Sequence, residues 1–442
     1  MTPWGAILRR LKEYSSAPFA RNVLTTLGGA VSAQAITLLS MIVVTRIYQP
    51  EAFALAQSIT SILTVLCVVA CLRYDVAMAS ADRRDLPTLA VMCAAILLVF
   101  SILCALAVLA LNRWGIGRLG LDLGAVAVWA LPASLITAMT STGGAHLLIR
   151  EGAFGALAGG KILQAIAFGV TAIGLSYAFS LSSGVLIADI IGRLMLASAL
   201  IIAIARRRPF GLPDLSAKGV ADVLAKYRRY PLLSLPGGLL NTLGGAFSTV
   251  WMLALFDPHT AGSYALVERV LSAPVALVAG SFAQAYQGRL ITHLDKGTPG
   301  VSADFTRLLR TQALLGAGLV VFLLIASPFL FRFVFGPQWI QAGAFGQIFG
   351  FYAGASLVAF PFNIALVLLG RQKQHFLWEV AWFGLLTGAW MIAWFLALRP
   401  EEALALVAGA GALAQGLFLL IAFQQLRRRD RELTDAAAAV NA

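Results

Sequence analysis

Asp189, Arg193, Glu268 and Arg269 lie inside long apolar segments of the sequence, where charge is costly and therefore often functional. Asp189 and Arg193 are four residues apart, so on a helix they share a face and can neutralise each other. This spacing favours a structural pair, with Asp189 also a candidate for binding a coupling ion. Glu268 and Arg269 are adjacent and project about 100° apart on a helix, so at least one needs a partner elsewhere. Arg269 is therefore a candidate cavity-lining cation, and Glu268 a candidate for binding a coupling proton or sodium ion.

Other polar side chains stand at the ends of apolar segments or within them. Arg46 follows the first segment, and Arg73 and Asp75 follow the second. The arginines are candidates for binding an anionic group, and Asp75 for binding an ion; alternatively, Arg73 and Asp75 only anchor a helix end. Gln34 and Asn241 lie in the first and seventh segments, where an amide could contact a polar substrate or bond a neighbouring helix.

Signatures of soluble enzymes are missing from the sequence. It has no phosphate-binding loop of the Gly-x-x-x-x-Gly-Lys-Ser/Thr type, so it carries no ATPase site of that kind. Its four histidines are scattered without metal-ligand spacing, and no nucleophile–base pair stands out. We therefore expect no catalytic residue, metal or cofactor. The cysteines all fall in the second and third apolar segments and are expected to be packing residues: Cys67, Cys71, Cys93 and Cys104.

The composition indicates an integral membrane protein. Of the 442 residues 60% are hydrophobic and 12% charged, and the mean hydropathy is +0.84. Long apolar runs near the length of a membrane-spanning helix recur along the chain. They predict an all-α protein with twelve transmembrane helices: 24–45, 53–72, 88–111, 123–148, 158–179, 185–205, 231–256, 261–286, 309–331, 341–369, 376–398 and 403–425.

The basic residues predict the orientation in the membrane. Most of the 33 Lys and Arg fall on one side of the predicted helices, which places both termini in the cytoplasm of a bacterium and the chain in its inner membrane. The net charge of +13 then needs no nucleic acid as a partner. Anionic lipids at the cytoplasmic face are the expected partners of these residues.

A short repeat predicts two copies of a six-helix bundle around a central cavity. Residues 26–32 (Thr-Leu-Gly-Gly-Ala-Val-Ser) return at 242–248 with Phe for Val. Six spans bring the chain back to the side where it began, so both copies have one orientation and are related by an axis along the membrane normal. The expected parts are an amphipathic segment 1–22, a bundle 23–205, a basic linker helix 206–230 capped by Ser216, a second bundle 231–426 and a cytoplasmic tail 427–442. Residues 287–308 are expected to form a flexible inner loop, and four prolines to kink or break helices: Pro132, Pro236, Pro274 and Pro361.

Three stretches resemble one transporter family. The first is Thr45-Arg-Ile-Tyr-Gln-Pro-Glu-Ala-Phe53, where Ala54 replaces the family's glycine. The second is Arg73-Tyr-Asp75, and the third is Ala261-Gly-Ser-Tyr-Ala265 with Arg269 and Pro274 after it. The chain resembles the polysaccharide-biosynthesis (Wzx-type) flippases of the multidrug/oligosaccharidyl-lipid/polysaccharide exporter superfamily.

This resemblance implies alternating access and a particular cargo. The cargo is an undecaprenyl-pyrophosphate-linked glycan, moved from the inner to the outer leaflet for surface or exopolysaccharide assembly, with a glycan polymerase and a chain-length regulator as possible partners. Arg46, Arg73 and Arg269 would meet the pyrophosphate, since guanidinium groups match phosphate oxygens. Two alternatives stay open: a cation-coupled multidrug exporter of the same superfamily, and a membrane-embedded glycan polymerase or ligase.

Overall fold

The computed structural model describes residues 18–78, 81–113, 126–178, 183–207, 211, 213–246 and 248–441, and all regular structure in these ranges is helical. Within them, ten helices are long and apolar enough to cross a membrane. The other two predicted spans, 123–148 and 231–256, correspond to α6 and to a stretch divided among shorter helices. The chain forms two compact units, unit 1 (Met1–Thr242) and unit 2 (Leu243–Ala442). The predicted amphipathic segment lies outside the described residues up to position 17.

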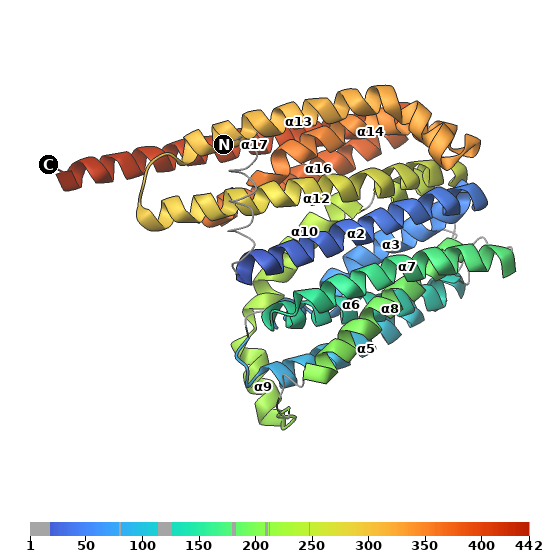
Figure 1. Cartoon of the computed structure of the whole chain (residues 1–442), viewed down its shortest axis with the longest axis horizontal. Helices are drawn as coiled ribbons and strands as arrows, with labels where there is room; N and C mark the ends of the chain where they lie inside the picture. The colour runs from blue at the N-terminus through green and yellow to red at the C-terminus, as the bar shows by residue number, and fades with distance from the viewer. Residues whose placement is uncertain are drawn as a thin grey trace, which may run out of the picture. The chain divides into compact units, whose positions relative to one another are not determined.

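Unit 1 is a bundle of long helices joined by short connections (Figure 1). Its elements are α2 (Pro18–Ile47), α3 (Pro50–Ala70), α4 (Tyr74–Ala77), α5 (Leu86–Arg113), α6 (Val126–Arg150), α7 (Phe154–Ala178), α8 (Gly184–Arg207), α9 (Ala217–Lys226), the π-helical turn η2 (Tyr230–Ser234) and most of α10 (Leu235–Ala246). In this unit α2 lies along α7, α8 packs against α6 and α7, and α5 packs against α6. A Cβ on Gly29 of α2 would lie 2.3 Å from that of Ala158 in α7, so glycine permits this close approach.

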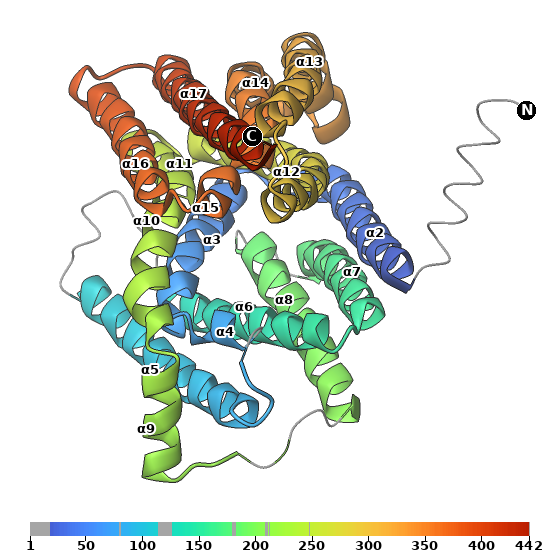
Figure 2. The same cartoon turned by 90° about the vertical axis from the view of Figure 1, so that its left-hand side faces the viewer.

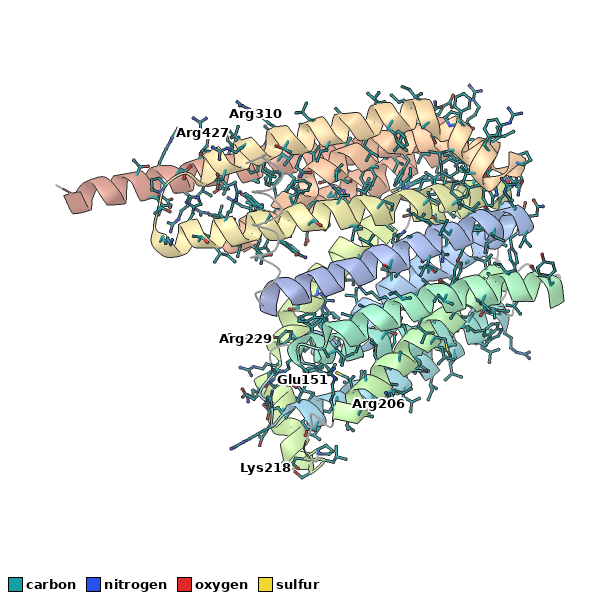
Figure 3. All side chains as sticks on the ribbon, in the orientation of Figure 1. Glu151, Arg206, Lys218, Arg229, Arg310 and Arg427 are labelled. Carbon is teal, nitrogen blue, oxygen red and sulfur yellow. The ribbon has the colours of Figure 1, made fainter. Side chains whose placement is uncertain are left out.

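Within the predicted linker 206–230 the described α-helix is α9, from Ala217 to Lys226, while residues 206 and 207 belong to α8. The Ser216 side chain accepts a hydrogen bond of 3.0 Å from the backbone N–H of Gly219, at the start of α9. At the other end of α9, Lys226 lies 2.5 Å from Asp82 and 2.6 Å from Asp85, and the Tyr227 hydroxyl donates to Asp85 at 2.9 Å. The linker is thus fastened to the connection between α4 and α5. Figure 3 shows Glu151, Arg206, Lys218 and Arg229 at one end of unit 1.

Unit 2 is a second helical bundle. It contains α11 (Ser248–Leu255), α12 (Pro258–Lys296), α13 (Val301–Phe329), η3 (Leu330–Phe335), η4 (Pro337–Trp339), α14 (Ile340–Ala359), η5 (Phe360–Phe362), α15 (Ala365–Leu368), α16 (Gln372–Phe395) and α17 (Pro400–Asn441). Within the unit, α14 packs against α12, α13 and α17, and α16 lies beside α17 (Figure 2). Glycines allow α13 and α14 to pack closely: a Cβ on Gly316 would lie 2.9 Å from the carbonyl oxygen of Gly354.

Two sequence-based boundaries in this part of the chain are wrong. The loop expected at 287–308 is almost entirely helical, because α12 continues to Lys296 and α13 begins at Val301. Asp430 of α17 replaces the missing helical partners at the start of α13. Its carboxylate accepts hydrogen bonds of 2.9, 2.9 and 2.8 Å from the backbone N–H groups of residues 300, 301 and 302, and also contacts the hydroxyl of Ser302.

The four marked prolines behave differently. The helices α6 and α12 continue through Pro132 and Pro274. Pro361 lies in a 3₁₀ turn at the end of α14, as expected for a residue that cannot donate a backbone hydrogen bond. Pro236 follows the π-helical turn η2, so the predicted span 231–256 is not one regular helix. Pro132 and Pro274 therefore lie inside helices, whereas Pro361 lies where one ends.

Candidate functional site

A polar cavity lies inside unit 2, on one face of α12. Tyr264, Glu268 and Ser272 are spaced four residues apart, so their side chains project from the same face of this helix. They line a cavity of about 170 Å³. The remaining walls come from four other helices of the unit: Ser248 of α11, Phe349 and Tyr352 of α14, Leu386 of α16, and Leu404, Val407 and Ala408 of α17.

Glu268 is the acidic side chain among these lining residues. Its Oε2 accepts a hydrogen bond of 2.8 Å from the hydroxyl of Thr249 in α11. Aromatic rings face it: Tyr264 packs edge-on against Phe349 with centroids 6.1 Å apart, and Phe349 packs against Tyr352 at 5.7 Å. A carboxylate together with aromatic faces and hydroxyl groups is an arrangement that binds cations.

A second cavity of about 180 Å³ shares the walls Ser248 and Leu386 with the first. Its other side is aromatic, since Trp251 of α11 and Trp390 of α16 stack with centroids 6.4 Å apart. Unit 2 therefore places a polar cavity next to an apolar, tryptophan-lined one. Such a pair of compartments can hold a charged head group and an apolar ring separately.

Arg269, the other charged candidate of the C-terminal half, is not among the described lining residues of this cavity. It is half-buried on α12, and its angular separation from Glu268 predicts this difference. Asn241 lies on α10, with its side chain outside the described part. In unit 1, Gln34 is half-buried midway along α2, and Arg46 is exposed at its end.

Asp189 and Arg193 of unit 1 form an ion pair. The Arg193 guanidinium donates to Asp189 at 2.7 Å, and both side chains are largely buried. Arg193 also donates to the hydroxyl of Thr60 on α3 at 3.3 Å. The structural interpretation of the spacing is thus confirmed. Coupling-ion binding by Asp189 stays a prediction.

Arg73 and Asp75 lie at the turn between α3 and α4. Leu72 and Arg73 both have left-handed backbone conformations, with φ of 50° and 64°, so the chain reverses sharply here. Arg73 lies against α10, where a Cβ on Gly238 would be 3.0 Å from the guanidinium. Asp75 is 5% exposed. Burial raises the pKa of its carboxyl, against the opposing charge of Arg73.

Part of the flippase-like stretch at 45–53 has a packing role. The Tyr48 hydroxyl donates to the carbonyl of Ala172 on α7 at 2.9 Å, and Pro50 is the first residue of α3. Gly184 makes room for the tyrosine, since a Cβ there would lie 2.2 Å from its hydroxyl oxygen. In this stretch, therefore, Tyr48 and Pro50 join helices, whereas Arg46 is exposed.

Sequence reasoning missed most of the walls of the polar cavity. Ser248, Tyr352 and the α17 residues carry no charge or motif that marks them. The four-residue spacing of Tyr264, Glu268 and Ser272 was a usable signal for three of the lining positions. Among the described residues there is no group of three or more His, Cys, Asp or Glu that could hold a metal ion. The four cysteines are free, with Cys71 and Cys93 buried.

No family model and no curated protein matches this sequence. Solved structures do resemble it. A multidrug resistance MATE family transporter of the MOP superfamily, in an inward-facing conformation, has a TM-score of 0.64 at 14% identity, over 91% of this chain and 96% of the other. A MOP superfamily transporter from Pyrococcus furiosus has a TM-score of 0.56 at 14% identity, over 94% and 97%.

The Vibrio cholerae MATE transporter VcmN, in its bent form, has a TM-score of 0.54 at 15% identity, over 96% of this chain and 99% of its own. At these identities the likeness establishes the fold alone. The chain has the fold of the MOP superfamily transporters. The fold expected from the resemblance is therefore shown, whereas membership of the superfamily and of its flippase branch stays a prediction.

Proposed function

We propose that this chain is a multi-pass secondary transporter that exports amphiphilic organic cations in exchange for a proton or a sodium ion bound at Glu268. The observation that carries the proposal is the position of Glu268 in a cavity of unit 2, among Tyr264, Phe349 and Tyr352. An acidic side chain within a membrane helix is costly unless it serves an ion or a substrate. This function was the alternative to the flippase at the sequence level.

The size of the cavity supports a small cation at Glu268. Its volume of about 170 Å³ is below the roughly 300–1,000 Å³ of sites that enclose a whole organic ligand. A proton or a sodium ion fits it, as does the head group of an amphiphilic cation. The transporters of similar fold include multidrug exporters, which supports an organic cation as the cargo.

Dye transport tests this proposal directly. The purified chain in proteoliposomes should move a cationic dye such as ethidium when a proton or a sodium gradient is imposed. Glu268→Gln keeps the shape of the side chain and removes its charge, so transport should fall at least tenfold, as expected for about 1.4 kcal/mol or more of lost interaction. Glu432→Gln, an exposed change near the end of α17, is the matched control. Wild-type dye transport by Glu268→Gln would refute the proposed role.

The flippase is the second candidate, and two arginines favour it. Arg46 and Arg269 lie in the stretches that resemble the flippases, outside the Glu268 cavity. Their guanidinium groups suit a pyrophosphate. If the cargo is a lipid-linked glycan, Arg46→Ala and Arg269→Ala should each fail to complement a strain that lacks its flippase while still inserting into the membrane. Full complementation by both variants would remove the arginines from the site, and Glu268-dependent dye efflux would favour the first candidate.

A glycan polymerase or ligase has no specific observation in its favour. For either transport function we retain the predicted topology, with the inner membrane as location and both termini in the cytoplasm. Reactivity of single cysteines introduced at Lys218 and Arg399 toward an impermeant thiol reagent would test it. In intact cells, the reagent should label position 399 and not position 218. The opposite pattern would invert the topology.

A further inference from the structure

Unit 1 contains a cavity of about 270 Å³ that the proposed function does not use. One side of the cavity is α6, where Gly143 and Gly144 have no side chain to fill the space. The other sides are α5, α8 and the segment from Cys71 to Met78. Most of the lining is apolar. Ala94 of α5 and Ile201 of α8 lie on its rim and are exposed on the apolar outer faces of these helices. The cavity is therefore accessible from the hydrocarbon region that those faces would contact.

One residue of the cavity wall has a buried carboxylate oxygen without a hydrogen-bond partner. Asp75 lines the cavity and is 5% exposed, and its Oδ1 is buried with no hydrogen bond. A buried polar atom without a partner destabilises the folded chain, and more strongly if it is charged. Such an atom at the end of an apolar cavity is expected to meet a hydrogen-bond donor that a ligand supplies.

The basic groups near Asp75 are directed elsewhere. The Arg73 guanidinium lies against Gly238 of α10 and does not line the cavity. The Nδ1 atom of His146 lies 2.9 Å from the backbone carbonyl oxygen of Asp75, so that nitrogen is occupied by the main chain. Among the described lining residues there is no Lys, Arg or His; the titratable groups are Asp75, Cys71 and Cys93. Asp75 is thus the acidic side chain among the described lining residues, Arg73 acts on it from outside the cavity, and most of the remaining lining is apolar.

These features select the chemistry of the ligand. A metal ion would need several donors, and no group of three or more His, Cys, Asp or Glu that could hold one occurs in the described part of the chain. An anionic amphiphile would be repelled by Asp75. A neutral alcohol would make only an ordinary hydrogen bond, whereas an ammonium group makes a charge-assisted one of about twice the strength.

We propose that this cavity binds a primary alkylammonium amphiphile. The apolar chain lies against Leu97, Ile201 and Ile204, and the ammonium group donates to Oδ1 of Asp75. The site belongs to unit 1 alone and does not depend on the transport function proposed for Glu268. It is a second ligand site of the chain.

The test uses the full chain in lipid nanodiscs with Glu268→Gln as the background, so that the cavity of unit 2 does not contribute charge recognition. The probes are octylammonium, octanol and octanoate. Two readouts report binding: the melting temperature, and alkylation of Cys71 and Cys93 by N-ethylmaleimide, with Cys104, which does not line the cavity, as the internal reference. Octylammonium should protect both thiols and bind at least roughly tenfold more tightly than octanol, and octanoate should not bind.

Two variants complete the test. Asp75→Asn keeps the size of the side chain and should weaken octylammonium roughly tenfold while leaving octanol unchanged. Ala94→Trp fills the rim, leaves Asp75 intact, and should weaken both probes. Equal affinities for octylammonium and octanol in the parent chain would overturn the proposal, and so would unchanged octylammonium binding by Asp75→Asn. If Asp75→Asn does not fold, the proposal is still tested by the relative affinities of octylammonium and octanol for the parent chain and by the binding of both probes to Ala94→Trp.

Discussion

The two units bury acidic side chains in opposite ways. In unit 1 the carboxylate of Asp189 lies 2.7 Å from the guanidinium of Arg193 on the same helix. In unit 2 the carboxylate of Glu268 meets the hydroxyl of Thr249 and opens onto a cavity. Thr60, which contacts Arg193, lies as far after Pro50 at the start of α3 as Glu268 lies after Pro258 at the start of α12. The comparison teaches that the same kind of side chain forms an ion pair on its own helix in unit 1 and lines a cavity in unit 2.

The strongest test of this contrast removes one charge from each unit. Arg193→Gln leaves Asp189 as an uncompensated buried charge and should destabilise the chain by about 3–5 kcal/mol. Glu268→Gln keeps the size of the side chain and an oxygen that can accept the hydrogen bond from Thr249, so its unfolding free energy should stay within about 1 kcal/mol of the parent. Denaturant unfolding in detergent micelles measures both.

A double variant serves as the control for that test. Asp189→Asn combined with Arg193→Gln leaves no unpaired charge and should recover most of the lost stability. If Glu268→Gln destabilises the chain as much as Arg193→Gln, then Glu268 is also part of a structural pair, and the distinction between the units fails.

The next effect concerns the start of α8 in unit 1, where Gly184 packs against Tyr48. Gly184→Ala would place a Cβ 2.2 Å from the Tyr48 hydroxyl oxygen, so unit 1 should lose about 1–3 kcal/mol through overpacking. Gly174→Ala on α7, with no atom within 4 Å of its Cβ, is the matched control and should be neutral or slightly stabilising. Thermal unfolding compares the two. Equal melting temperatures would mean that Tyr48 moves away freely.

The connection between α12 and α13 in unit 2 should depend on a single side chain. Asp430→Ala removes the acceptor of the backbone N–H groups of residues 300–302 and should cost about 1–2 kcal/mol, as the loss of a helix cap does. Hydrogen exchange of these amides should accelerate, while exchange in the middle of α13 stays unchanged. In Asp430→Asn, which keeps one acceptor oxygen, the exchange rates of these amides should lie between those of the parent and those of Asp430→Ala. Unchanged exchange in Asp430→Ala would contradict the assignment.

The smallest expected effect concerns α9, the linker helix of unit 1. Exposed ion pairs from Lys226 to Asp82 and Asp85 hold this helix to the connection between α4 and α5. The hydrogen bond from Lys226 holds the pKa of Asp85 below its usual range. A lowered pKa in the folded state means that the contact contributes above about pH 4 and is lost as the pH falls through the folded pKa. Limited proteolysis of residues 211–229 should therefore speed up in acid and in high salt.

Lys226→Gln should make that cleavage fast at neutral pH and insensitive to salt. The Asp430 contacts of unit 2, made to backbone N–H groups, should by contrast tolerate high salt. A linker that resists proteolysis equally in parent and variant would show that apolar contacts, rather than ion pairs, hold α9.

The sequence was sufficient for the helical class, the linker helix and the ion pair of Asp189 and Arg193, because each depends on local spacing. Ser216 caps α9 as its position before the helix predicts, and the four-residue spacing of Asp189 and Arg193 sets their contact. The loop expected at 287–308 failed for a tertiary reason. A polar stretch with glycine and proline stays helical here because Asp430, distant in sequence, satisfies the start of α13.

The candidate site was predictable only in part. Glu268 was identifiable as a charge within an apolar segment. The expected roles of Glu268 and Arg269 differed, and the structure separates the two side chains as their adjacency requires. Tyr352 and Phe349 could not be found, because an aromatic residue in a membrane helix is unremarkable until packing shows which cavity it faces. Asp75 was marked by its charge, but its apolar surroundings come from three other helices.

Helix α12 of unit 2 contains Glu268 and ends shortly before residues 300–302, which contact Asp430. The helix runs 39 residues from Pro258 to Lys296 and contains Pro274. The 22 residues beyond that proline span about 33 Å at 1.5 Å per residue. A bend of roughly 10° at Pro274, where helices bend most readily, would displace Lys296 by about 6 Å. A small bend near the cavity would thereby move the far end of the helix by about the width of a side chain.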